Sequence, residues 1–452
     1  MEKRESLGSR LGFIMLSVGC AVGLGNVWRF PYVAGKYGGG IFVLLYLLFL
    51  LLLGFPILTM ELAVGRAGGA NIIGCMRDLT GNSRRWVIPV KVCFIGNLLL
   101  MMYYTVISGW LFAYTCSYID GTIMNCQTAA EISGRFGTLV SNPWSSAGYM
   151  AVVVAAGVVM CAGGLQKSVE KSVKVMMFLL FLLIGILAGY ALSTPGAAQG
   201  ISFYLKPDWK AFSGDFGATV FAAMGQAFFT LSIGVGSMAI FGSYIGKERR
   251  LAGESVIIIM LDTLIAFFAG VIIFPICFSY GVNVESGPSL IFQSLPNIFT
   301  HMPGGRWWGM MFFIFLSLAA LTTVVAVFEN LIAFLMDELK MKRRNASLLT
   351  GVAVAVLSLP CVFGFNLWKN FQPLGKGSNV LDLEDFIMSQ NLLPLGALVT
   401  VIFCTSRWQL FISESNTGKG IKFPGELYFF CKYILPVVVL VIFIWGYIQF
   451  FK

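Results

Sequence analysis

Long apolar runs alternate with short polar connections along almost the whole chain. Runs of about 20 apolar residues are long enough to cross a bilayer as a helix. The pattern predicts eleven spans, at about residues 11–36, 40–65, 87–118, 146–163, 173–194, 213–245, 252–281, 307–338, 346–364, 380–405 and 425–450. None of the polar connections is typical of a soluble domain. The sequence therefore predicts an all-α polytopic membrane protein, with residues 1–452 as a single transmembrane domain.

Two of these spans contain glycines and polar residues that interrupt the apolar pattern. The interruptions are Gly19, Gly23 and Gly25 in the first span, and Thr230, Ser232, Gly234 and Gly236 in the sixth. Non-helical backbone survives in a membrane only where protein, ligand or water covers it. Freed carbonyls suit a cation, and freed N–H groups suit a carboxylate. We therefore expect both spans to unwind at a binding site, the alternative being that the glycines only permit close helix packing.

Charge and composition agree with a membrane protein. The chain is 58% hydrophobic and 12% charged, and its basic residues collect in alternate connections. By the positive-inside rule these connections are cytoplasmic. We expect a multi-pass protein of the plasma (inner) membrane with its N-terminus inside and, after an odd number of spans, its C-terminus outside. The formal charge of +10 then reflects topology, and no nucleic-acid partner is expected because the basic residues form no single patch.

Cysteine and histidine usage gives little sign of catalysis. The ten cysteines lie mostly within or beside apolar spans and form no CxxC pair, so they are expected to be small buried residues. A disulfide between Cys116 and Cys126 remains open. The single histidine, His301, falls in a predicted outer loop. Without a cluster of His and Cys ligands, we expect no enzyme.

Three segments, in the same order along the chain, resemble the neurotransmitter:sodium symporter family. They are SRLGFIMLSVGCAVGLGNVWRFPYVAGKYGGGIFVLLYLLFLLLLGFPILTMELAVGR, GQAFFTLSIGVGS and LAALTTVVAVFENLIAFLMDEL. The similarity covers nearly the whole chain and extends to the eleven-span, bacterial amino-acid transporter branch. It implies an inverted repeat of five plus five spans, with discontinuous spans one and six at the central binding site, plus an eleventh span. It also implies sodium-coupled import by alternating access.

The resemblance implies two co-transported sodium ions. The first would be bound by the substrate carboxylate and by the Ala21 carbonyl, Asn26, Thr230 and Asp262. The second would be bound by the carbonyls of Gly19, Val22 and Ala319 and the hydroxyls of Thr322 and Thr323. These are the oxygen ligands that hard cations prefer. Paired threonines can also merely bond their own helix.

Asp262 distinguishes this chain from chloride-dependent relatives. A carboxylate inside a span costs roughly 2.5 to 3.5 kcal/mol on insertion scales and so indicates function. In chloride-dependent members, Tyr, Gln and Ser groups surround an anion beside the first sodium. Tyr46 and Gln226 match that pattern, but the serine position is Ala266. Because Asp262 brings its own negative charge, no chloride is expected.

The same resemblance implies an amino-acid site. Gly23 stands where monoamine carriers have an aspartate, and the space it leaves suits a substrate carboxylate bound by the Leu24 and Gly25 N–H groups and the Tyr104 hydroxyl. The substrate ammonium would meet carbonyls that include Ala21, Phe229, Thr230 and Ser232. The implied side-chain pocket is Leu100, Tyr104, Phe229, Ser232, Val235, Thr323 and Val327. Since it holds no charge, a buried ionic side chain would be unpaired. We expect a neutral, hydrophobic or aromatic L-amino acid.

Gates also follow from the resemblance. An outer salt bridge would join Arg29 to Asp385 above a lid of Tyr104 and Phe229. A cytoplasmic gate would pair Arg4 with Asp337 near Ser243 and Tyr244, although a generic surface pair is an equally good interpretation of Arg4. Glu61 would cap freed N–H groups of the sixth span, unless it only snorkels to the interface.

Two departures from the family concern the inner side. Leu7 replaces a tryptophan of the N-terminal gate, and Ser168 and Phe178 replace the glycine and proline of span five. Without that proline, the inner half of span five should unwind less readily.

Two alternatives to a transporter remain at this stage. A membrane sensor that binds an amino acid without moving it would have the same binding residues. A membrane enzyme is disfavoured because no catalytic cluster is evident. In each case the expected partners are a small-molecule amino acid and the lipid bilayer.

Overall fold

The computed structural model describes residues 5–126, 128–207, 209, 216–282 and 289–450, and that part of the chain is helical without a β-strand. The first half contains α1 (Arg10–Ala21), η1 (Gly25–Arg29), α2 (Phe30–Lys36), α3 (Gly40–Phe49), η2 (Leu50–Gly54), α4 (Phe55–Gly68), α5 (Ile72–Thr80), α6 (Arg84–Ile119), η3 (Thr122–Asn125), α7 (Ala129–Ser141), α8 (Pro143–Ala162), η4 (Leu165–Glu170), α9 (Lys171–Leu192) and α10 (Ala197–Leu205).

The second half of the described chain is also helical. It contains α12 (Phe216–Thr230), α13 (Ser237–Gly242), α14 (Leu251–Ser279), η5 (Leu290–Ser294), α15 (Leu295–His301), α16 (Gly305–Leu339), α17 (Arg343–Leu357), α18 (Leu359–Gly364), α19 (Val380–Asp385), η6 (Phe386–Leu392), α20 (Leu393–Ser406), α21 (Trp408–Ser415), η7 (Gly425–Leu427), η8 (Phe430–Ile434) and α22 (Leu435–Phe450).

The helices follow the predicted spans closely. Nine helices of the described chain are long and apolar enough to cross a membrane. The first predicted span is a tenth candidate, α1 followed by η1 and α2, bent by 56° at its break. The remaining predicted span, residues 213–245, corresponds to the two short helices α12 and α13. The all-helical membrane fold with discontinuous spans one and six is therefore confirmed, while the five-plus-five repeat remains a prediction.

Backbone conformation explains why neither broken span continues as one helix. After Ala21, Val22 is extended (φ −69°, ψ 115°), and helical structure resumes at Gly25. In the second break, Gly234 and Gly236 have φ of +104° and +76°, a region that glycine enters without steric cost. Ser232 also has a positive φ, of +50°, which is uncommon for a residue with a side chain. Three such residues within five positions exclude a regular helix.

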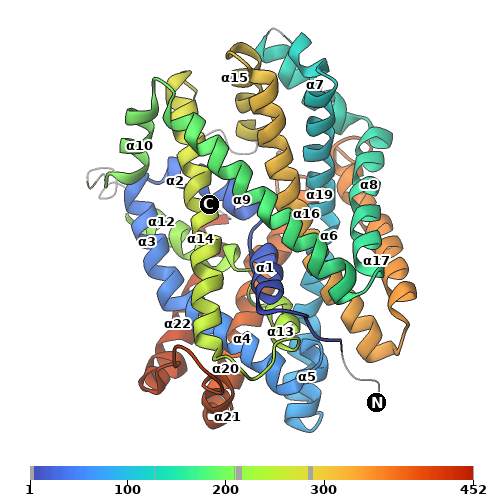
Figure 1. Cartoon of the computed structure of the whole chain (residues 1–452), viewed down its shortest axis with the longest axis vertical. Coiled ribbons are helices and arrows are strands. Elements are labelled where there is room, and N and C mark those ends of the chain that lie inside the picture. The colour runs from blue at the N-terminus through green and yellow to red at the C-terminus, as the bar shows by residue number, and fades with distance from the viewer. Residues whose placement is uncertain (1–4, 127, 208, 210–215, 283–288, 451–452) are drawn as a thin grey trace.

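The predicted cytoplasmic segments lie together at one end of the molecule. In Figure 1 the N-terminal end, α5, α13 and α21 lie at the bottom, opposite α7 and α15. Hydrogen bonds join these segments in pairs. Two of them join side chains, Glu5 with Arg343 and Arg77 with Glu338. Three join a side chain to a carbonyl: Gln166 to Ser6, Arg66 to Arg249, and Arg250 to Gly420. The basic connections, which alternate with less basic ones along the sequence, therefore lie at the same end of the molecule.

The last helix ends away from these basic segments. Near its C-terminal end, a methyl group on Gly217 at the start of α12 would lie 3.4 Å from the Trp445 ring. Tyr447 donates to Asn391 Oδ1 in η6 at 2.5 Å. Gly217 lies in the first turn of α12, and Asn391 lies near the end of η6. Which end faces the cytoplasm remains a prediction.

The cysteines form no disulfide in the described part of the chain. All ten are free thiols, including Cys116 and Cys126, so the disulfide that the sequence left open is not formed. His301 lies at the end of α15, where its Nδ1 is 2.8 Å from the Asn297 carbonyl.

Candidate functional site

The two breaks meet in the centre of the helices, and Gly23 lies at their closest approach to α6 and α16. A methyl group on Gly23 would lie 2.5 Å from Tyr104 Oη and 2.9 Å from Thr323 Oγ1. Leu24 N–H donates to Tyr104 Oη at 3.2 Å. A backbone N–H and a phenol hydroxyl thus meet beside Gly23, so close that a residue with a side chain would clash with the hydroxyl. This is a donor pair suited to a carboxylate.

Three of the residues expected at the first sodium are joined by hydrogen bonds. Asn26 Nδ2 lies 2.9 Å from Thr230 Oγ1 and 2.8 Å from Asp262 Oδ1, and Thr230 Oγ1 donates to Asp262 Oδ2 at 2.9 Å. All three side chains are at most 1% exposed. Asn26 Oδ1 accepts the Gly23 N–H at 3.1 Å. The carboxylate, amide and hydroxyl therefore lie at the edge of the first break, where oxygen ligands would suit a hard cation.

The residues expected at the second sodium form a separate cluster between α1 and α16. Thr323 Oγ1 lies 2.9 Å from the Val22 carbonyl, 3.3 Å from Gly19 O and 3.4 Å from Ala319 O. Thr322 Oγ1 donates to the Ala319 carbonyl at 2.9 Å. Three carbonyls and two hydroxyls meet here with no charged side chain among them. The bond from Thr322 to its own helix is the bland alternative foreseen for a threonine pair, but the bonds from Thr323 reach across to another helix.

The residues compared with a chloride site surround Asp262 from two sides. Gln226 Nε2 donates to the Gly25 carbonyl at 2.9 Å. Tyr46 and Ala266 are both fully buried, on α3 and α14. The carboxyl group of Asp262, on α14 with Ala266, is bonded to Asn26 and Thr230.

The expected pocket residues line the centre from three helices and the second break. Leu100 and Tyr104 lie on α6, Thr323 and Val327 on α16, and Phe229, Ser232 and Val235 at the second break; of these, Phe229 and Ser232 are partly exposed and the other five are buried. Ser232 Oγ is 3.4 Å from the Cys20 carbonyl at the end of α1, and a methyl group on Gly25 would lie 2.8 Å from the Phe229 ring. The pocket residues therefore span both breaks and carry no ionic group.

Glu61 contacts the second break. Its Oε1 accepts the Gly234 N–H at 2.5 Å, and the side chain is fully buried on α4. The interfacial position considered as an alternative for Glu61 is therefore wrong. The carboxylate lies inside the protein and holds a peptide group that unwinding frees.

The expected outer salt bridge is not formed in the structure. Arg29 and Asp385 are both described and form no ion pair with each other. The Arg29 guanidinium lies 4.4 Å from the centre of the Phe229 ring, in a cation–π contact. Asp385 Oδ1 accepts from Tyr103 Oη at 3.1 Å and from Ser389 Oγ at 2.7 Å. The carboxylate is held by two hydroxyls and the cation by the aromatic lid residue, which replaces the expected pairing in this conformation.

The expected inner gate is only partly described. Arg4 lies outside the described residues. Asp337 Oδ2 accepts the Asn71 N–H at 2.8 Å and Asn71 Nδ2 at 3.1 Å. Ser243 donates to the Ile240 carbonyl of its own helix.

Sequence reasoning missed a buried ionic network at the basic end of the molecule. Arg343 makes two bonds of 2.7 and 2.8 Å to the fully buried carboxylate of Glu329, and Tyr244 Oη donates to the same carboxylate at 2.8 Å. Arg343 also bonds Glu5 and, at 3.2 Å, the Cys161 carbonyl. An acidic residue inside the ENLIAF run, followed by KMKRRN, was the available sequence signal. The network joins the N-terminal segment to α8, α16, α17 and the turn that follows α13.

A second missed residue, Glu170, holds the N-terminal segment to span five. Its carboxylate accepts the Gly8 N–H and Ser9 Oγ, each at 2.7 Å, and pairs with Lys174. Span five is helical from Leu165, beginning as the π-helical η4. Phe178, the position of the family's proline, lies inside α9 and is exposed. Span five is thus wound at its inner end in this structure.

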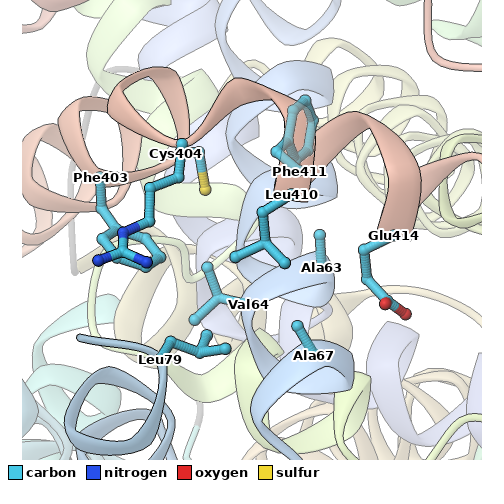
Figure 2. Close-up of a pocket in the computed structure, with 10 residues that line it drawn as sticks. Ala63, Val64, Ala67, Leu79, Phe403, Cys404, Leu410, Phe411 and Glu414 are labelled. Carbon is cyan, nitrogen blue, oxygen red and sulfur yellow. The ribbon is translucent and has the colours of Figure 1, made fainter. Parts of the chain in front are cut away.

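A small cavity elsewhere is unrelated to these breaks. Figure 2 shows it between α4 and the α20–α21 corner, lined by Ala63, Val64, Ala67, Leu79, Phe403, Cys404, Leu410, Phe411 and Glu414. Its volume of about 10 Å³ admits roughly one water molecule. It is therefore too small for an organic substrate.

The geometry can now be compared with known proteins. The model of the Sodium:neurotransmitter symporter family matches residues 4–133 and 131–452. The chain belongs to this family. The resemblance seen in the three sequence segments is therefore confirmed for the sodium:neurotransmitter symporter family over nearly the whole chain, and with it a sodium-dependent transporter scaffold.

Two bacterial relatives in this family have lengths similar to that of this chain. An uncharacterized sodium-dependent transporter of Haemophilus influenzae is 34% identical over 458 residues, covering 98% of each chain. One from Bacillus subtilis is 31% identical over 452 residues, again covering 98% of each. The solved structure of MhsT in complex with L-phenylalanine matches with a TM-score of 0.88 and 35% identity, covering 98% of this chain and 99% of that one.

Proposed function

We propose that this member of the sodium:neurotransmitter symporter family is a symporter in which two sodium ions drive import of a neutral, hydrophobic or aromatic L-amino acid. One observation carries the proposal: the first break brings the Leu24 N–H and the Tyr104 hydroxyl to the Gly23 space, directly beside the oxygen cluster of Asn26 and Asp262. A carboxylate at Gly23 would thus lie next to a sodium ion. Amino acid and ion would then stabilise each other electrostatically.

The substrate class rests on the charge of the pocket. Its seven side chains are uncharged, so an acidic or basic substrate side chain would be buried without a partner, at a cost of several kcal/mol. The phenylalanine in the MhsT complex is consistent with an aromatic substrate. We further propose chloride independence, because the buried Asp262 carboxylate already supplies a negative charge beside the first sodium cluster.

Alternating access would use the two five-span repeats implied by the family. In that arrangement the broken spans one and six move relative to α6 and α16, which provide Tyr104 and Thr323. The contacts of Thr323 with Gly19 and Val22 join a broken span to an unbroken one. Sodium at this second cluster would favour the conformation in which these helices are together.

Uptake into proteoliposomes tests the proposal. Labelled phenylalanine should accumulate with an inward sodium gradient and fail to accumulate with potassium. Replacing chloride by gluconate should leave uptake unchanged, and a large loss would contradict the role given to Asp262. Sodium-dependent binding without accumulation would instead identify a sensor, and conversion of the amino acid to a product would identify an enzyme.

A further inference from the structure

A polar cluster lies one helical turn from the proposed pocket, toward the basic end of the molecule. It consists of Asn97 on α6, Ser237 at the start of α13 and Asn330 on α16, all fully buried. Ser237 Oγ donates to Asn97 Oδ1 at 2.8 Å, and Asn330 Nδ2 donates to the same oxygen at 3.0 Å. Three helices therefore meet at one amide oxygen, which fixes the orientation of the Asn97 side chain.

The other end of the Asn97 amide holds the second break. Asn97 Nδ2 donates to the Val235 carbonyl at 2.9 Å. Val235 lies in the non-helical stretch between α12 and α13, where a buried carbonyl without a partner would cost several kcal/mol in a membrane. The Gly234 N–H, two peptide groups toward the N-terminus, is held by Glu61. Two helices, α4 and α6, thus fix neighbouring polar groups of the same unwound segment.

Gly96, the neighbour of Asn97, receives the side chain of Val235. A methyl group on Gly96 would lie 2.9 Å from Val235 Cγ1, 3.0 Å from Met388 Sδ and 3.3 Å from Leu392. Cβ contacts below 3.0 Å require a neighbour to move, and the short branched Val235 side chain has little freedom to do so. Consecutive residues of α6 therefore accommodate the side chain and the carbonyl of one pocket residue.

We propose that Gly96 and Asn97 set the size of the substrate that the pocket accepts, with Asn97 as the positioning residue for Val235. This inference rests on the proposed function, because it takes Val235 to be a wall of the side-chain pocket. Gly96 lets the valine recede toward α6, and Asn97 holds it there through its carbonyl. The room left on the pocket side then admits a large apolar side chain.

Competition binding on purified full-length protein tests this inference without requiring transport. Labelled phenylalanine is displaced in sodium by tryptophan and by alanine, and the ratio of the two inhibition constants is measured. In Gly96→Ala the new methyl should push Val235 into the pocket. The inhibition constant of tryptophan should then rise about tenfold relative to that of alanine, the effect of roughly one methylene in an apolar pocket. Adding Val235→Ala to this variant should restore tryptophan binding, because it removes the clashing methyl groups.

Variants of the polar cluster separate positioning from general packing. Asn97→Leu keeps the side-chain volume but removes the bond to the Val235 carbonyl. The inhibition constant of tryptophan should therefore rise again relative to that of alanine. Ser237→Ala is the matched control, since Ser237 bonds Asn97 Oδ1 and leaves the bond from Asn97 Nδ2 to the Val235 carbonyl in place, and the ratio should stay within about twofold. Thermal unfolding of each variant checks that it is folded.

The outcomes distinguish this inference from the proposed function. An unchanged ratio in folded Gly96→Ala and Asn97→Leu would overturn it, even if the wild type transports. Loss of all binding in both variants, without rescue by Val235→Ala, would also overturn it, because the pair would then support the fold alone. The expected ratio changes in a protein that binds but does not accumulate phenylalanine would support the pocket assignment and refute the symporter.

Discussion

At the scale of single residues, a variant of Thr323 tests whether this threonine is a sodium ligand or only a helix-packing residue. Thr323→Val should raise the sodium concentration for half-maximal uptake by roughly tenfold. The change removes a hydroxyl that lies near three buried carbonyls, a loss of about 1–3 kcal/mol. Thr350→Val is the matched control, because Thr350 is buried on α17 and its hydroxyl has no partner in the described structure. Equal sodium dependence in both variants would exclude Thr323 from the ion site.

The proposed role of Gly23 depends on its lack of a side chain. Gly23→Ala should abolish phenylalanine uptake or weaken substrate binding by at least about tenfold, because its methyl would occupy the point where Leu24 N–H and Tyr104 Oη converge. Gly185→Ala should transport normally, since a methyl on that glycine of α9 would meet nothing within 4 Å. Uptake kinetics measure both variants. Normal phenylalanine affinity in Gly23→Ala would show that the substrate carboxylate does not bind at Gly23.

At the scale of the helical elements, the inner half of span five is expected to remain wound throughout transport. Its backbone is helical from Leu165 onward, and Phe178 keeps the N–H that a proline would remove. Hydrogen exchange of residues 171–178 should stay equally slow in sodium and in potassium. The N-terminal segment around Gly8 and Ser9, which Glu170 holds by single hydrogen bonds, should exchange faster in potassium. Phe178→Pro is the positive control and should raise exchange in span five.

The elements were predictable from sequence to a greater extent than their contacts. Apolar run length fixes where a span can lie, and glycine together with polar residues marks a break, so both broken spans were found. The pairing of Arg29 with Asp385 failed because it depends on conformation, which a motif does not encode. Asn97 was missed since a lone polar residue in an apolar run has no periodic signal, and Glu170 was missed because it lies in a charged connection where a surface residue is the ordinary interpretation. Only the packing of α6 against the second break reveals what Asn97 holds.

At the scale of the whole molecule, the ionic contacts are concentrated at the basic end. Arg66, fully surrounded there, bonds Glu414 and the carbonyls of Gly246 and Arg249. Buried ion pairs of this kind add little net stability but specify which segments meet. The N-terminal segment joins this end through Glu5 and Gly8. Opening the basic end would therefore require breaking charged contacts, whereas the expected lid is held by the contact of Arg29 with Phe229 and the hydrogen bond of Leu24 N–H with Tyr104.

Membrane orientation follows from the same asymmetry and can be tested directly. The basic segments all lie at the end of the molecule that carries the N-terminus, and the end of α22 lies near Gly217 and Asn391, away from them. If the positive-inside rule holds, a reporter fused after Lys452 should be outside the cytoplasm. Alkaline phosphatase, active only outside, should then be active there, whereas green fluorescent protein should be dark.

The control fusion ends one span earlier. Reporters placed after Lys422, before the last span, should behave in the opposite way, because the connection between α21 and η7 belongs to the basic end, where Arg250 bonds the Gly420 carbonyl. Identical reporter activity at the two positions would mean that α22 does not cross the bilayer. Exchanged activities would mean that the basic end faces outward, and the direction of the proposed import would then have to be reversed.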